Sequence, residues 1–184
     1  MTPLAPLGLL AVVPALDRPD LLADPVAAAL RDLPEAAQVG VAVIDPDFAD
    51  TAQFCARYQV RPEESANCVV VAGRRADDER VAACLVLATT RADVNTTVRK
   101  RLDVRKASFL AMDDAVTRTG MAYGGITPVG LPVGWPVLVD AAVARAPRVV
   151  VGSGVRGSKL VLPGRVLAAL PAAEVVDGLG LPPR

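Results

Sequence analysis

A loop rich in glycine and proline is the feature that most limits how this chain can fold. Residues 119–132 hold four glycines and two prolines. Glycine permits positive φ and close backbone approach, whereas proline fixes φ and removes a hydrogen-bond donor. The segment is therefore expected to be a shaped loop. Backbone N–H groups at Gly124 and Gly125 can converge on one acceptor, as in an oxyanion hole, and an ordinary glycine-rich connection is the alternative.

The core must be built mainly from Ala, Val and Leu, because 52% of the 184 residues are hydrophobic but only 3% are aromatic. A chain of this length is expected to form one domain. The apolar stretch Leu4–Leu16 is broken by two prolines and is too short to span a bilayer. None of the three cysteines forms a C-x-x-C pair, so reduced thiols in a cytoplasmic protein are expected.

Histidine is absent from the sequence. Its absence excludes Ser-His-Asp and Cys-His catalysis, and it excludes the zinc sites that depend on a pair of histidines. Any chemistry must use backbone groups, hydroxyls, carboxylates, amines or the substrate itself. We therefore expect neither a metal nor a cofactor.

Helical and strand patterns alternate along the chain. A capping box at Asp50–Gln53 opens one helix, and two β-rich runs around the polar segment Gly73–Arg80 predict a hairpin. The sequence predicts a single compact α/β domain with a mixed, partly antiparallel sheet and packed helices. Helices are expected at residues 25–33, 51–58, 94–102, 113–119, 141–145 and 163–170, and strands at 39–44, 67–72, 81–89, 136–139, 149–152, 158–162 and 174–176.

Charge is distributed unevenly in a chain whose net charge is zero. Residues 1–50 hold eight acidic side chains and two arginines, whereas residues 91–106 hold six basic and two acidic side chains. Two solvated faces would explain this pattern. The basic segment can also contact a phosphate backbone, which is the functional alternative.

Six short motifs follow one another along the chain: Arg91-x-Asp93, Lys106–Phe109, Gly124–Pro128, Pro136–Asp140, Gly152–Gly154 and Ser158–Pro163. In their shared order they resemble the YbaK/ProX family of free-standing aminoacyl-tRNA deacylases. This family is related to the editing domain of bacterial prolyl-tRNA synthetases. The resemblance runs from about Thr51 to Val176 and leaves residues 1–45 as an N-terminal extension.

The resemblance implies a compact α/β fold and hydrolysis of the ester that joins a wrong small amino acid to tRNA, with tRNA for proline as the first candidate. It implies tRNA as a partner, and an aminoacyl-tRNA synthetase is a further candidate. The residues assigned to catalysis are Asn67, Gly124, Gly125 and Thr127. Those assigned to substrate binding are Ile126, Pro128, Asp140, Ser153 and Gly154. Those assigned to tRNA binding are Arg99, Lys100, Arg101, Arg105 and Lys106.

One position departs from the family pattern. Asn67 stands where the family usually has a pocket lysine, and an amide forms hydrogen bonds but carries no charge. A non-catalytic module that binds tRNA ends, an amino acid or a protein partner is therefore the second hypothesis. Two assigned residues also have structural alternatives, since Asp140 can cap the next helix and Ser153 can belong to a plain turn.

Overall fold

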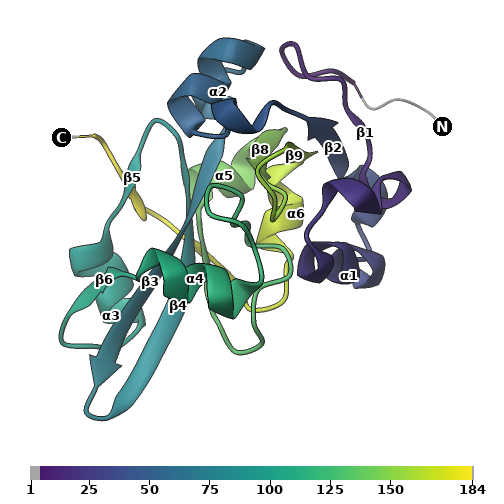
Figure 1. Ribbon diagram of the computed structural model, residues 1–184. Helices are drawn as coiled ribbons and strands as arrows, with labels where there is room; N and C mark the ends of the chain where they lie inside the picture. Colours follow the sequence, from purple (N-terminus) through teal and green to yellow (C-terminus); the bar gives the residue numbers. More distant parts are fainter. Residues whose placement is uncertain (1–4, 184) are drawn as a thin grey trace.

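Two main sheets form the framework of the α/β fold in the computed structural model, which describes residues 5–183 (Figure 1). The larger sheet has five strands in the order β10-β7-β4-β3-β6. Strand β7 runs parallel to β4 and β10, whereas β3 is antiparallel to β4 and β6. The predicted mixed, partly antiparallel sheet is thus confirmed. The strands are β3 (Ala66–Arg75), β4 (Asp78–Leu87), β6 (Ala107–Phe109), β7 (Val137–Asp140) and β10 (Ala173–Val176).

The smaller sheet is antiparallel throughout, with the order β1-β2-β9-β8. A parallel bridge between Ser65 and Val150 links it to the start of β3. The two sheets therefore meet edge to edge at one end of β3. The strands are β1 (Val13–Pro14), β2 (Gly40–Val43), β8 (Val149–Gly152) and β9 (Ser158–Leu162), and a separate pair joins β5 (Arg91–Ala92) to β11 (Gly180–Leu181).

Short helices surround the sheets, close to the predicted positions. They are α1 (Asp24–Asp32), α2 (Thr51–Tyr58), α3 (Arg99–Arg101), α4 (Met112–Thr119), α5 (Ala141–Arg145) and α6 (Gly164–Ala168). The predicted helix at 94–102 differs in detail. It is one turn of π-helix over Val94–Val98 followed by α3, and the Asp93 side chain caps it by accepting from Thr96 N and Thr97 N.

The hairpin of β3 and β4 is longer than the sequence predicts. Pairing continues through the expected polar turn as far as Arg75 and Asp78, because ladder hydrogen bonds join backbone groups whatever the side chains are. Gly73 lets β6 approach closely, since a Cβ there would lie 2.5 Å from the Lys106 carbonyl oxygen. The far end of this hairpin extends well away from α2 (Figure 1).

The hydrophobic core includes the N-terminal residues that lie outside the family resemblance. Val26 and Leu30 of α1 and Val39 are fully buried in the main cluster, together with Leu85 and Leu160 from the two sheets. A second cluster lies between the smaller sheet and α2, around Phe54. Residues 5–45 therefore contribute directly to the domain core. Within the described chain, no helix has the length and apolar character needed to cross a membrane.

Candidate functional site

A cavity of about 1080 Å³ lies where the two sheets meet, and α2, the start of β3, β8 and the 123–126 loop line it. This volume is enough for a small-molecule ligand or the end of a larger one. Its walls are largely apolar, with Phe54, Val60, Val69, Ile126 and Val150 among them. The polar side chains of this pocket are a minority of its lining, and they are the candidates for binding or catalysis.

Asn67 is one of these polar groups, as the sequence predicts. It lies near the start of β3 and lines the cavity. The hydroxyl of Thr51, the first residue of α2, donates to Asn67 Oδ1 at 2.6 Å. Asp50 caps α2 by accepting from Ala52 N, and this fixes the end of the helix that carries Thr51. The Asn67 side-chain NH₂ group makes no hydrogen bond within residues 5–183, so its donors are available to a ligand.

The glycine-rich loop reaches the same cavity through Gly124 and Ile126. Gly124 has a φ of +78°, which explains the need for glycine there. The N–H groups of Gly124 and Ile126 form no hydrogen bond to any described residue. Two residues of the cavity lining therefore keep backbone donors that could serve an oxyanion.

Gly125 has a different role from the one predicted. Its N–H donates to the Ala122 carbonyl at 2.9 Å, and its own carbonyl accepts from Gly154 N at 2.7 Å. A Cβ at Gly125 would lie 2.6 Å from the Val155 carbonyl oxygen. Gly125 is therefore needed for close backbone packing, and Gly125→Val is expected to disrupt the fold. Thr127 and Pro128 are buried as well, and neither residue lines the cavity.

Three residues assigned to substrate binding serve local structure instead. Asp140 accepts from Ala142 N at 2.8 Å through one oxygen and from Gly180 N at 2.7 Å through the other. It therefore caps α5 and does not line the cavity. Ser153 is fully buried, and its hydroxyl bonds Ser158. Gly154 has a φ of +86° and forms a turn. A helix cap, a buried hydrogen bond and a turn therefore account for Asp140, Ser153 and Gly154, respectively.

Sequence reasoning missed two basic residues of the cavity lining, Arg156 and Lys159. Arg156 is partly exposed and donates to the carbonyls of Tyr123 and Pro46, whereas Lys159 is buried. Lys159 lies on β9, is only 8% exposed and lines the cavity. Its Nζ donates to the Ala49 carbonyl at 3.1 Å and to the Gly124 carbonyl at 3.5 Å, and it lies 5.5 Å from the centre of the Phe54 ring. A lone lysine within the apolar run Ser158–Leu162 was the available signal, because charged residues are almost never fully buried without a partner.

The two cavity cysteines, Cys55 and Cys68, are poor nucleophiles because burial keeps their thiols protonated. Burial raises the pKa of the Cys55 thiol and, more strongly, that of the Cys68 thiol above its usual value. The thiolate is the reactive form of cysteine. Both side chains therefore remain neutral thiols at neutral pH and add to the apolar wall. No group of three or more metal-ligating side chains gathers within the described residues.

The predicted tRNA-binding residues lie around the far end of the hairpin. Arg101 forms an ion pair with Glu174, and Arg99 Nε donates to the Asn95 carbonyl at 2.8 Å. Lys100, Arg105 and Lys106 are exposed and make no side-chain hydrogen bond or ion pair within the described chain. Two of these basic side chains are thus held by partners within the chain, and the other three are available to contact a ligand.

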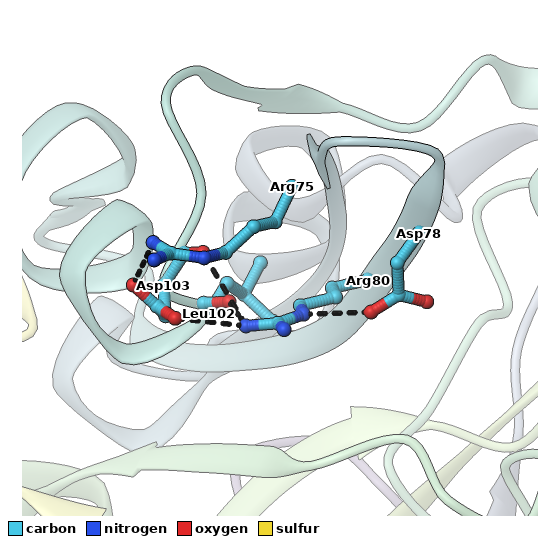
Figure 2. Close-up of polar contacts among 5 residues, drawn as sticks. All are labelled: Arg75, Asp78, Arg80, Leu102 and Asp103. Carbon is cyan, nitrogen blue, oxygen red and sulfur yellow. Dashed lines mark hydrogen bonds and ion pairs between the residues drawn. The ribbon is translucent and has the colours of Figure 1, made fainter.

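A second, open hollow of about 490 Å³ lies at this end and is lined by Arg74, Arg75, Ala76 and Arg105. Asp103 organises the arginines beside it, since it pairs with Arg75 at 2.6 Å and with Arg80 at 3.2 Å (Figure 2). Arg80 also donates to the Leu102 carbonyl and pairs with Asp78. We call Arg74, Arg75 and Arg105 the basic end of the hairpin.

Comparison with known proteins agrees with this architecture. A crystal structure of a candidate trans-editing enzyme for prolyl tRNA synthetase superposes with a TM-score of 0.70 at 19% identity, covering 84% of this chain and 94% of the other. A hypothetical protein superposes with a TM-score of 0.74 at 18% identity, covering 86% and 100%. A scaffold protein used for epitope backbone grafting gives 0.72 at 19% identity, covering 84% and 95%.

These identities establish the fold alone, and no curated protein matches the sequence significantly. The family is established separately, because the model of the aminoacyl-tRNA editing domain matches residues 45–170. This range contains α2, the hairpin, the glycine-rich loop and Lys159, and it agrees with the resemblance seen in the sequence motifs. The chain belongs to the aminoacyl-tRNA editing domain family.

Proposed function

We propose that this protein is a trans-editing aminoacyl-tRNA deacylase, which hydrolyses the ester between a wrongly attached small amino acid and tRNA, with tRNA for proline as the first candidate. The observation that carries the proposal is that Asn67, Lys159, Gly124 and Ile126 all line one cavity. The Asn67 amide, the Lys159 ammonium and the two loop N–H groups each keep a donor without a partner among the described residues. Such donors, held in an apolar site, stabilise the negative charge of an ester-hydrolysis transition state. Water is the nucleophile, since the cavity cysteines are neutral.

The lining of the cavity fits a small apolar amino acid. A synthetase pocket separates substrates that differ by one methylene only about 10–200-fold, so a second hydrolytic site improves accuracy. The cavity presents small side chains such as Ala66, Cys68 and Ala88 beside Val150. The two N–H donors of the Asn67 amide can donate hydrogen bonds to ligand oxygens, which suits the ester or a ribose hydroxyl.

The basic end of the hairpin supports tRNA as the carrier of the amino acid. Strand β3 joins the two regions, because Asn67 lies in the cavity and Arg74 lies at the basic end. Seven residues of extended strand span about 23 Å. Phosphates a few nucleotides from the 3′ end can therefore meet Arg74, Arg105 and Lys106 while the aminoacyl group occupies the cavity.

The decisive experiment measures release of amino acid from a panel of mischarged tRNAs by the purified protein. We expect hydrolysis of at least one small amino acid well above the uncatalysed rate. Asn67→Ala is expected to reduce this rate with little change in unfolding temperature, since its side chain faces the cavity. Asn67→Lys is expected to change which amino acid is removed.

A non-catalytic binding module is the second candidate, and the absence of the family lysine at position 67 favours it. That hypothesis predicts saturable binding of tRNA or an amino acid without release of product. Binding that persists with hydrolysis at the uncatalysed rate across the whole panel would replace the deacylase proposal with this one.

A further inference from the structure

Lys159 carries a positive charge in an unusually buried position. It lies on β9 between two fully buried neighbours, Ser158 and Leu160, and it is the only lysine or arginine among the buried residues of the described chain. No carboxylate lies within ion-pair distance of its Nζ in residues 5–183. Carbonyl oxygens of Ala49 and Gly124 and the face of the Phe54 ring surround it instead. Such a group costs folding free energy, and its position in the cavity calls for a functional account.

The donors of the ammonium group can be counted. A protonated lysine has three N–H donors, and two of them are directed to the carbonyls of Ala49 and Gly124. The third has no acceptor within the described chain. Because Gly124 and Ile126 line the same cavity as Lys159, the free ammonium donor and the unpaired loop N–H groups belong to residues of one site.

We propose that Lys159 is the catalytic cation of the deacylase, and that its third N–H binds the carbonyl oxygen of the aminoacyl ester as that oxygen becomes negative. The inference rests on the function proposed above. It also accounts for the departure at position 67, because a buried positive charge reaches the cavity from β9 while β3 contributes the neutral Asn67 amide. The other cation of the lining, Arg156, is partly exposed and donates to the carbonyls of Tyr123 and Pro46.

The reaction balances without any further reagent. A water oxygen forms a bond to the ester carbonyl carbon, and the C=O electron pair moves to the oxygen that Lys159 holds. Collapse of this intermediate breaks the bond to the ribose oxygen, which takes up the proton that the water loses. The products are the free amino acid and tRNA with its terminal hydroxyl restored, and Lys159 keeps its own proton throughout.

The surroundings of Lys159 make this role dependent on pH. Burial, followed by the nearby positive charge of Arg156, lowers the pKa of Lys159 to about 8, while Asp50 and Cys55 on the α2 side act in the opposite direction. Below that pH the charged form predominates and the cation is present. Above it the neutral amine predominates, so the enzymatic acceleration over uncatalysed hydrolysis is expected to decline.

A purely structural lysine is the rival explanation, since Lys159 also holds the Gly124 loop in place. The two explanations differ in kinetics. Loss of an oxyanion donor lowers kcat and leaves KM almost unchanged, whereas a displaced loop also weakens substrate binding. Only the catalytic role ties the alkaline decline of kcat to the titration of this side chain.

The test compares wild type, Lys159→Met, Lys159→Arg and the control Arg31→Met in steady-state deacylation between pH 6 and pH 10. Arg31 is an exposed residue of α1, so its replacement removes one charge far from the lining. We expect Lys159→Met to lose about 10²–10³-fold in kcat, as for other oxyanion donors. We expect Lys159→Arg to recover part of the rate and to lose the alkaline decline, because arginine does not titrate in this range. Arg31→Met should match wild type.

The outcomes separate the two proposals. Wild-type protein without activity on any mischarged tRNA would overturn the deacylase function and the role of Lys159 with it. An active wild type together with a fully active Lys159→Met would overturn the role of Lys159 alone. Should Lys159→Met fail to fold, as thermal unfolding would reveal, Lys159→Arg decides the matter. An alkaline decline that persists near pH 8 in that variant would also overturn the role of Lys159.

Discussion

Positive charge is buried at one end of strand β3 and exposed at the other. At the cavity end, Lys159 is enclosed by carbonyls and an aromatic ring. Beside the basic end of the hairpin, Asp103 pairs with both Arg75 and Arg80 near the surface (Figure 2). A desolvated charge interacts strongly with a nearby ligand, whereas exposed charges act weakly on neighbours but collectively on a polyanion. Chemistry is therefore expected at one end and attraction of tRNA at the other.

The largest effect on stability is expected at the cavity end. Phe54 is 1% exposed and packs against Tyr58 with ring centres 5.4 Å apart. Phe54→Ala leaves a cavity and should lower the free energy of unfolding by about 3–5 kcal/mol. Denaturant unfolding measures this change, and Arg80→Ala at the other end serves as the comparison with little expected loss. Equal losses in both variants would contradict the contrast between the two ends.

An intermediate effect, on binding rather than stability, is expected at the basic end. Arg74 and Arg105 line the open hollow and have no ion-pair partner within the described chain. The double replacement Arg74→Ala, Arg105→Ala should weaken tRNA binding and reduce the slope of log affinity against log salt by about two units. Binding measured across a salt series provides the test. A slope equal to that of Arg31→Ala would show that tRNA does not contact this surface.

The smallest effect is expected from the ion pairs themselves. Asp103 has a φ of +52°, a conformation that asparagine also tolerates. Asp103→Asn should therefore leave the unfolding midpoint almost unchanged, because exposed ion pairs contribute little. The same change frees Arg75 and Arg80 and should modestly tighten tRNA binding at low salt. Weaker binding would mean that Asp103 is needed to orient these arginines toward the phosphates.

Sequence reasoning succeeded where the signal was local and repeated. The capping box at Asp50 placed α2 correctly, and the β-rich runs placed β3 and β4. Shared motif order led to the family that the domain match establishes. Asn67 reached the cavity as predicted because it lies on a strand beside α2.

Other site residues depended on tertiary information that local patterns lack. Asp140 and Ser153 have the chemistry of ligands, yet their oxygens are occupied by Gly180 and Ser158, which are brought there by folding. Lys159 was missed for the converse reason. Its strand is almost entirely buried, and only the meeting of the two sheets determines that this one side chain opens into the cavity.

The backbone contact between the glycine-rich loop and β8 has a consequence for how this site can diverge. A Cβ at Gly152 would lie 2.3 Å from the Gly125 carbonyl oxygen, so loop and strand meet without room for side chains. Shifting the loop would require the sheet beneath it to shift as well. Variants selected for a new substrate should therefore first accumulate replacements at side chains of the opposite wall, such as Thr51, Cys55 and Cys68. Gly125 and Gly152 should stay unaltered.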